Sequence, residues 1–157
     1  MTEFDGKLSL RKSALRRQRD AEHLLLPPKE NIHEQGALVR HTRGAMYLSG
    51  YGVECFLKAY LISLYPNLNR LSDVLVEIRK SDPTIRDICG SAGHDLPYLL
   101  YLTKLEERFN PGNRAIWNKC AKWMSTWRYD PTLADRPTAQ SMVNASKAFI
   151  PRIDLQM

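Results

Sequence analysis

Apolar side chains recur along the chain with the three-to-four-residue spacing of helices, and proline and glycine divide this pattern into segments. No Asn-Gly hairpin signal and no run of alternating apolar and polar residues interrupts the pattern. It predicts helices over 8–26, 36–65, 71–80, 96–109 and 113–127, and a last helix that begins near Pro137 or Thr138. We therefore expect an all-α helical bundle that forms one domain over residues 1–157.

The segment 36–65 is expected to be the central helix of this bundle. After Arg43 it is apolar around nearly its whole circumference, which is typical of a helix packed on several sides. Inside a helix, Gly44, Gly50 and Gly52 each cost about 1 kcal/mol relative to alanine. Three such residues indicate close approach by a neighbouring helix or by a second subunit.

Glu54 and Lys58 are the unusual pair on this helix. They stand four residues apart, in the favourable order for an ion pair. Tyr47 and Tyr51 share their face, within an arc of about 80°. Burying both charges requires that each is paired or hydrogen-bonded. Two interpretations remain open, a polar cleft whose floor is this tyrosine-lined stripe and an internal ion pair that locks the bundle.

A second candidate is the sequence Gly93-His94-Asp95-Leu96, directly before the segment 96–109. Asp95 is well placed to cap the helix, and Pro97 falls in the first turn, where its missing N–H does no harm. His94 beside a carboxylate suits general acid or base chemistry. Equally, its ring could hydrogen-bond a backbone carbonyl and brace the turn.

A third candidate is Arg128, which stands between two aromatic residues where the segment 113–127 ends. A guanidinium suits phosphate recognition, and the rings of Trp127 and Tyr129 suit base stacking. Asp130 follows, before Pro131, either as part of the same binding segment or as a turn residue. The alternative for Arg128 is a structural contact with the Trp127 ring.

Charge adds to these candidates the expectation of an anionic partner. The 157 residues hold 23 Lys and Arg against 17 Asp and Glu, a formal net charge of +6. The excess is +3 over 1–43, −1 over 44–103 and +4 over 104–157. Five basic residues fall within positions 11–19, and they form either a phosphate-binding face or a solvated one. The favoured partners are RNA or a nucleotide.

Neither a metal nor a cofactor is expected. Three cysteines, Cys55, Cys89 and Cys120, lack metal-ligand spacing, and the sequence has no Walker A, dinucleotide-binding or zinc-protease motif. No uncharged apolar stretch of eighteen residues and no signal peptide is present. We therefore expect no membrane insertion and a cytoplasmic protein.

Three motifs together resemble the HEPN family of small helical domains. Residues 45–59, AMYLSGYGVECFLKA, are similar to the family's second-helix signature of small residues followed by Glu and Leu-Lys-Ala. Gly93-His94-Asp95-Leu96 resembles the turn before its third long helix, and Arg128-Tyr129-Asp130-Pro131 the segment leading into its last helix. The resemblance spans about residues 10–153.

This resemblance implies an up-and-down bundle of four to five main helices, usually a homodimer with its cleft at the subunit interface. Many members are metal-independent endoribonucleases, and several are toxins encoded beside a nucleotidyltransferase-like antitoxin. Others bind nucleotides or act as interaction modules. The partners implied are thus RNA or a nucleotide, a nucleotidyltransferase-type antitoxin and a second copy of the chain.

Catalytic members of the family carry an Arg and a later His that are separated by four to six intervening residues. After Arg128 the corresponding positions are occupied by Leu133, Ala134 and Asp135, so the motif is not intact. Two functions therefore stand as hypotheses, beside a third in which the chain is a purely structural α-helical oligomer. One is an endoribonuclease with the catalytic residues Arg128, Glu54 and His94 and the RNA-binding residues Lys58, Tyr51, Tyr129 and Asp130. The other is a non-catalytic module that binds a nucleotide or a nucleotidyltransferase.

Overall fold

The computed structural model describes residues 5–26, 35–129 and 134–155, with the backbone alone for 35–40. Within these ranges the chain forms six α-helices and no β-strand, so the predicted all-α bundle is confirmed. The helices are α1 (Lys7–Leu24), α2 (Gln35–Ser63), α3 (Leu71–Ser81), α4 (Leu96–Thr103), α5 (Pro111–Cys120) and α6 (Arg136–Asp154). Short 3-10 helices lie between them: η2 (Ser91–His94), η3 (Leu105–Arg108) and η4 (Ser125–Tyr129).

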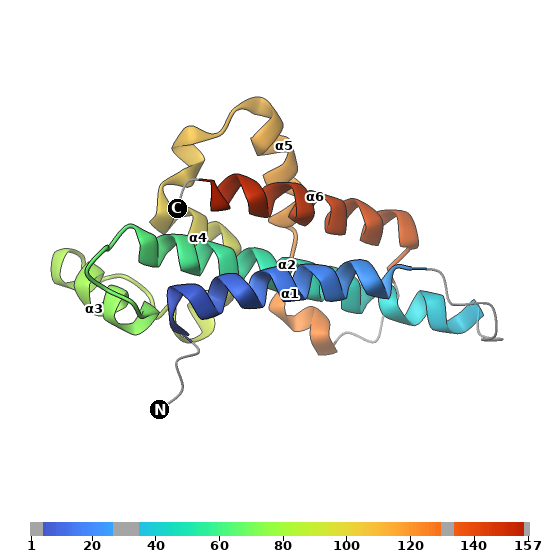
Figure 1. Cartoon of the computed structure of the whole chain (residues 1–157), viewed down its shortest axis with the longest axis horizontal. Coiled ribbons are helices and arrows are strands. Elements are labelled where there is room, and N and C mark those ends of the chain that lie inside the picture. The colour runs from blue at the N-terminus through green and yellow to red at the C-terminus, as the bar shows by residue number, and fades with distance from the viewer. Residues whose placement is uncertain (1–4, 27–34, 130–133, 156–157) are drawn as a thin grey trace.

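The long helix α2 is central, as its composition predicts. α1 and α6 run alongside it and make its most extensive contacts, while α3, α4 and η4 pack on other parts of its surface (Figure 1). Every residue from 52 to 62 is buried, so no side of this stretch faces solvent. Nevertheless, no helix in the described ranges is both long and apolar enough to cross a membrane.

Two glycines of α2 mark close approaches of different kinds. A Cβ added to Gly52 would lie 3.2 Å from the carbonyl oxygen of Ala14, so α1 packs directly on the bare backbone there. At Gly50 an added Cβ would overlap Cδ1 of Trp123, and the neighbour is thus a side chain rather than a helix. The indole Nε1 of Trp123 donates a hydrogen bond to the carbonyl oxygen of Tyr47 at 3.0 Å.

The prediction of one continuous helix over 96–109 is wrong. α4 ends at Thr103, and Lys104 adopts the left-handed conformation with φ 54° before η3 begins. The Thr103 hydroxyl donates to the Leu100 carbonyl at 2.7 Å and accepts the Leu105 amide at 3.4 Å. This side chain therefore competes with the backbone for hydrogen bonds at the position where the helix stops.

The prediction over 113–127 is wrong in the same way. α5 begins at Pro111 and ends at Cys120, and after a turn the chain continues as η4. On α5, Trp117 packs against Phe149 of α6 with ring centroids 5.3 Å apart. α5 packs on α6, and the turn after Cys120 then brings the chain to α2, where Trp123 is buried. By contrast, α1, α2, α3 and the start of α6 lie within two residues of their predicted positions.

We predict opposite stability effects for two alanine substitutions on α2. Gly50→Ala should destabilise the protein by ~1–3 kcal/mol, because the new methyl group displaces the Trp123 indole. Gly44→Ala is the matched control, since its Cβ would meet Leu24 Cδ1 at an ordinary 3.5 Å. That control should stabilise the helix by about 0.5–1 kcal/mol. Urea unfolding followed by circular dichroism measures both, and equal effects would contradict the observed packing.

Candidate functional site

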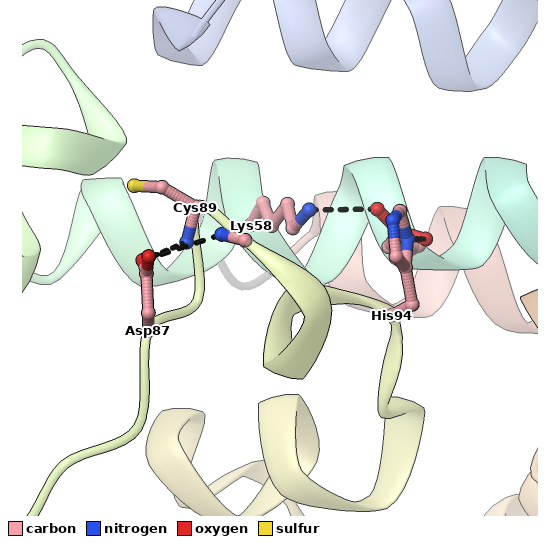
Figure 2. Close-up of polar contacts among 6 residues, drawn as sticks. Lys58, Asp87, Cys89 and His94 are labelled. Carbon is pink, nitrogen blue, oxygen red and sulfur yellow. Dashed lines mark hydrogen bonds and ion pairs between the residues drawn. The ribbon is translucent and has the colours of Figure 1, made fainter.

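The Glu54 carboxylate is the centre of the candidate site. It is only 1% exposed, yet both of its oxygens have a nitrogen partner. Lys58 Nζ donates to Oε1 at 2.7 Å, and His94 Nδ1 lies 2.9 Å from Oε2. Figure 2 shows Lys58 on α2 and His94 in η2 reaching this carboxylate from two different elements. We call these three residues the Glu54 cluster.

The protonation pattern of His94 follows from its partner. An ionised carboxylate only accepts hydrogen bonds, so the contact with Glu54 assigns the proton to Nδ1. The other ring nitrogen, Nε2, is then an acceptor in the neutral imidazole. The His94 side chain is 43% exposed, in contrast to 2% for that of Glu54. An imidazole that bonds to a carboxylate through one ring nitrogen and is partly exposed to solvent is suited to act as a general base.

Gly93 allows η2 to lie this close to α2. An added Cβ would overlap the Ile88 carbonyl oxygen and would stand 2.9 Å from Lys58 Nζ. Any larger residue would therefore push η2 away from the ammonium group. The φ angle of Gly93 is not positive, so the requirement is one of space and not of backbone conformation.

Two aspartates brace the loop on either side of His94. Asp87 Oδ1 accepts the backbone amides of Cys89 at 2.9 Å and Gly90 at 3.2 Å (Figure 2). Asp95 accepts the amide of Tyr98 at 3.0 Å and so caps α4, as the sequence predicts. The hydrogen bonds of Asp87 and Asp95 thus restrain the backbone on both sides of His94. Its carboxylate partner is Glu54 of α2 and not the adjacent Asp95.

An aromatic row leads along the same face of α2 toward the Glu54 cluster. Trp123 stacks on Tyr47 with ring centroids 6.1 Å apart, and Tyr47 stacks on Tyr51 at 6.2 Å. The Arg17 guanidinium of α1 lies 5.8 Å from the Tyr51 ring centroid. Tyr51 precedes Glu54 by about one helical turn. The row therefore places aromatic rings and a cation about one helical turn before Glu54.

Tyr51 and Cys55 keep their protons at neutral pH. Burial, together with the Glu54 carboxylate, raises the pKa of the Cys55 thiol to about 12. The neighbouring Cys55, burial and Glu54 raise the pKa of Tyr51 to about 12 as well. Because the thiolate is the reactive form of cysteine, Cys55 is not suited to act as a nucleophile. Tyr51 and Cys55 are therefore less suited than the His94 imidazole to accept a proton beside Glu54.

Arg128 and Tyr129 lie apart from the Glu54 cluster. Both are exposed on η4, where the Arg128 guanidinium stands 4.6 Å from the Tyr129 ring centroid. Within the described residues, no contact joins either side chain to Glu54, Lys58 or His94. Thus the structure unites three of the expected site residues in one chain and leaves these two elsewhere. Asp130 lies outside the described residues.

The arginine that lies over Trp127 is Arg43 of α2, at 5.1 Å from the ring centroid. The proposed structural contact between Arg128 and Trp127 is therefore wrong, because Arg128 turns to Tyr129 instead. Sequence reasoning missed Gly93 and Arg17 as members of the site. The position of Gly93 directly before His94 is a sequence signal for its role, whereas nothing in the sequence singles out Arg17 among the basic residues of α1.

The described part of the chain contains no group of three or more His, Cys, Asp or Glu side chains that could hold a metal ion. A comparison of the chain with protein-family models, curated protein sequences and solved structures found no match.

We predict that Glu54 and Lys58 contribute to the free energy of unfolding as a coupled pair and not independently. Lys58→Met should lower the free energy of unfolding by ~3 kcal/mol, because it removes the cation from a buried carboxylate. The double variant Glu54→Gln/Lys58→Met should recover part of that loss, since no unpaired charge remains buried. Denaturant unfolding of both single variants and the double variant gives the coupling. Additive losses would contradict the pairing.

We also predict that one thiol per native chain reacts with iodoacetamide near pH 8. Cys89 is exposed, although partial burial and Asp87 also raise its pKa, whereas burial raises the pKa of Cys55 and of Cys120 to about 12. Raising the pH increases the thiolate fraction, so labelling of the two buried thiols should require higher pH or unfolding. Mass spectrometry of tryptic peptides locates the label. Modification of Cys55 as fast as that of Cys89 would contradict its burial.

Proposed function

We propose that this chain is a HEPN-type RNA-binding protein in which His94 accepts a proton during metal-independent cleavage of RNA. The observation that carries the proposal is the 2.9 Å contact between the buried Glu54 carboxylate and Nδ1 of the partly exposed His94. This contact leaves Nε2 as the acceptor on the solvent side. The positive charge of the two ends of the chain favours a polyanionic substrate.

In the proposed reaction, His94 Nε2 takes the proton of a ribose 2′-hydroxyl. The 2′ oxygen attacks the adjacent phosphorus, and the bond from phosphorus to the 5′ oxygen of the next nucleotide breaks. The products are a 2′,3′-cyclic phosphate and a 5′-hydroxyl whose proton comes from water. Glu54 stabilises the imidazolium that forms on His94, and it keeps the ring in the required orientation.

The surface around His94 supplies the expected means of holding RNA. The half-buried rings of Tyr51 and Tyr47 lie on the same face of α2 as Glu54, and the exposed parts of such rings stack on bases without sequence preference. Arg17 lies beside Tyr51 and offers a guanidinium for phosphate. The proposal assigns Lys58 a different task, which is to neutralise Glu54 within the fold.

Arg128 would contribute to the site of a second copy of the chain. On one chain it is exposed beside Tyr129, away from His94. The family resemblance implies a homodimer with a shared cleft, in which Arg128 of one subunit would hold the phosphate that His94 of the other acts on. Asp130, directly after Tyr129, would belong to the same binding segment. A cytoplasmic location and a nucleotidyltransferase-type antitoxin partner, encoded in an adjacent reading frame, complete this proposal.

One observation favours a second candidate, a non-catalytic module that binds a nucleotide or a nucleotidyltransferase. The Arg-to-His motif is not intact after Arg128, and within one chain the Arg128 side chain does not meet His94. Such a module would bind its nucleotide or protein ligand without turnover and would not cleave RNA. Cleavage assays therefore distinguish the two functions.

We expect the wild-type protein to cleave end-labelled RNA in the presence of a chelator. His94→Gln should lower the rate about 100-fold or more, because the amide can still bond to Glu54 but cannot accept the proton. His23→Gln is the matched control, since His23 is exposed on α1. Gel analysis of the products measures both rates. Equal rates for His94→Gln and the wild type would contradict the role of His94, and binding without cleavage would favour the non-catalytic module.

Mixing subunits of two impaired variants tests whether the cleft is shared between the subunits of a dimer. Arg128→Ala and His94→Gln should each lose most of the activity alone, whereas mixed subunits should regain up to about a quarter of the wild-type rate. Recovery is expected because about half of all dimers are mixed when subunits pair at random, and each mixed dimer has one intact site. No recovery in dimers that exchange subunits would contradict the contribution of Arg128 across the interface.

A further inference from the structure

The helix α1 lies on the outside of the bundle, across α2 (Figure 1). Its buried residues, Ala14, Gln18 and Ala21, share the side that packs on α2 and α6. At about 100° per residue, the opposite side collects six exposed residues within an arc of about 100°. They are Leu8, Lys12, Leu15, Arg16, Arg19 and His23. We call these six residues the outer face of α1.

Two leucines leave apolar surface in water on this face. Leu8 is 61% exposed and Leu15 is 42% exposed. Because they stand seven residues apart, they lie nearly in line along the helix. Single exposed leucines are common on protein surfaces and need no explanation. These two become informative through the cations that lie beside them.

The cations of the outer face, Lys12, Arg16 and Arg19, form no ion pair with the described residues. Three carboxylates on or beside α1 are held by other cations at distances of 2.6, 3.5 and 2.9 Å, in the pairs Arg11–Asp154, Arg17–Asp20 and Lys147–Glu22. No acidic residue of α1 falls within the arc of the outer face. The described part of the chain therefore does not neutralise these three charges by direct contact.

A bilayer surface with anionic headgroups matches both features of the outer face. Headgroup phosphates attract Lys and Arg side chains, and apolar side chains bury at the boundary between headgroups and acyl chains. A polyanion such as RNA would use the cations but would leave the leucines in water. The exterior of a helix is also convex, so it offers no groove for an extended peptide but can lie flat on a membrane.

We propose that the outer face of α1 binds reversibly to membranes that contain anionic lipids. The helix would lie parallel to the surface, with Leu8 and Leu15 at the boundary with the acyl chains and the cations among the phosphates. Such a contact is peripheral and involves no insertion of a helix across the bilayer. It does not depend on RNA cleavage, because His94 and Glu54 belong to η2 and α2.

Flotation of the full chain with large unilamellar vesicles tests the proposal. Vesicles of phosphatidylcholine with about 30% phosphatidylglycerol should bind the protein about tenfold more tightly, or better, than vesicles of phosphatidylcholine alone. Binding should weaken as the salt concentration rises from about 0.05 M to about 0.5 M, because salt screens the attraction. The full chain includes Glu3, Glu30 and Glu34, which lie outside the described residues, so the measurement contains their effect as well.

Two variants separate the contributions of charge and apolar surface. Lys12→Gln/Arg16→Gln/Arg19→Gln should weaken binding to the anionic vesicles about 100-fold, since each cation near such a surface contributes a factor of about five. Leu8→Gln/Leu15→Gln should weaken binding about tenfold, because it removes the apolar contact. Both leucines are exposed, so this variant leaves the core intact.

The matched control is Lys104→Gln/Lys119→Gln/Lys122→Gln, which removes the same charge from three exposed lysines outside α1. Its binding to the anionic vesicles should stay within about twofold of the wild type. Circular dichroism melting checks that every variant is folded. The proposal would be overturned if the wild type does not bind the anionic vesicles, if the control is weakened as much as the α1 cation variant, or if the leucine variant binds as the wild type does.

A short RNA with methylated 2′-hydroxyls tests the alternative partner. If the cation variant binds this RNA more weakly but binds the vesicles as the wild type does, the outer face serves RNA and the membrane proposal is overturned. His94→Gln should bind the vesicles as the wild type does. Loss of RNA cleavage alone would therefore contradict only the proposed function, and loss of vesicle binding alone would overturn only the membrane proposal.

Discussion

A carboxylate buried in an apolar helix imposes the strongest physical demand in this structure. An unpaired charge at Glu54 would be very costly, so its surroundings must supply donors. Lys58 supplies the first from the same helix, and this pair needs no tertiary structure to form. His94 supplies the second from a distant loop. Satisfying Glu54 therefore also fixes where η2 lies, and Gly93 provides the space.

The same helix organises the opposite end of the molecule. Earlier on α2, Gly50 receives the Trp123 indole, while the Arg43 guanidinium lies over the Trp127 ring. Both regions thus share one rigid element, and each is completed by a short segment that packs on it. Rigid helices hold functional groups more reproducibly than loops do. His94 and Trp127 lie in the short segments η2 and η4, and each has a partner on α2.

Much of this fold follows from local sequence signals, whereas most of the site does not. Periodicity and caps place α1, α2, α3 and the start of α6, because these features depend on neighbouring residues. The ends of α4 and α5 were predicted incorrectly, since they depend on the Thr103 hydroxyl and on the distant partner of Trp123. The Glu54–Lys58 contact was accessible from its spacing. The contact between Glu54 and His94 spans forty residues and leaves no local pattern.

The positions of the tryptophans have a spectroscopic consequence. All three, Trp117, Trp123 and Trp127, fall within eleven consecutive residues, and their partners lie on α6 and α2. Intrinsic fluorescence therefore reports the attachment of this one segment to the bundle. α1 and α3, which contain no indole, would be silent to it. Emission and helical ellipticity would diverge if the segment detached before the remaining helices unfolded.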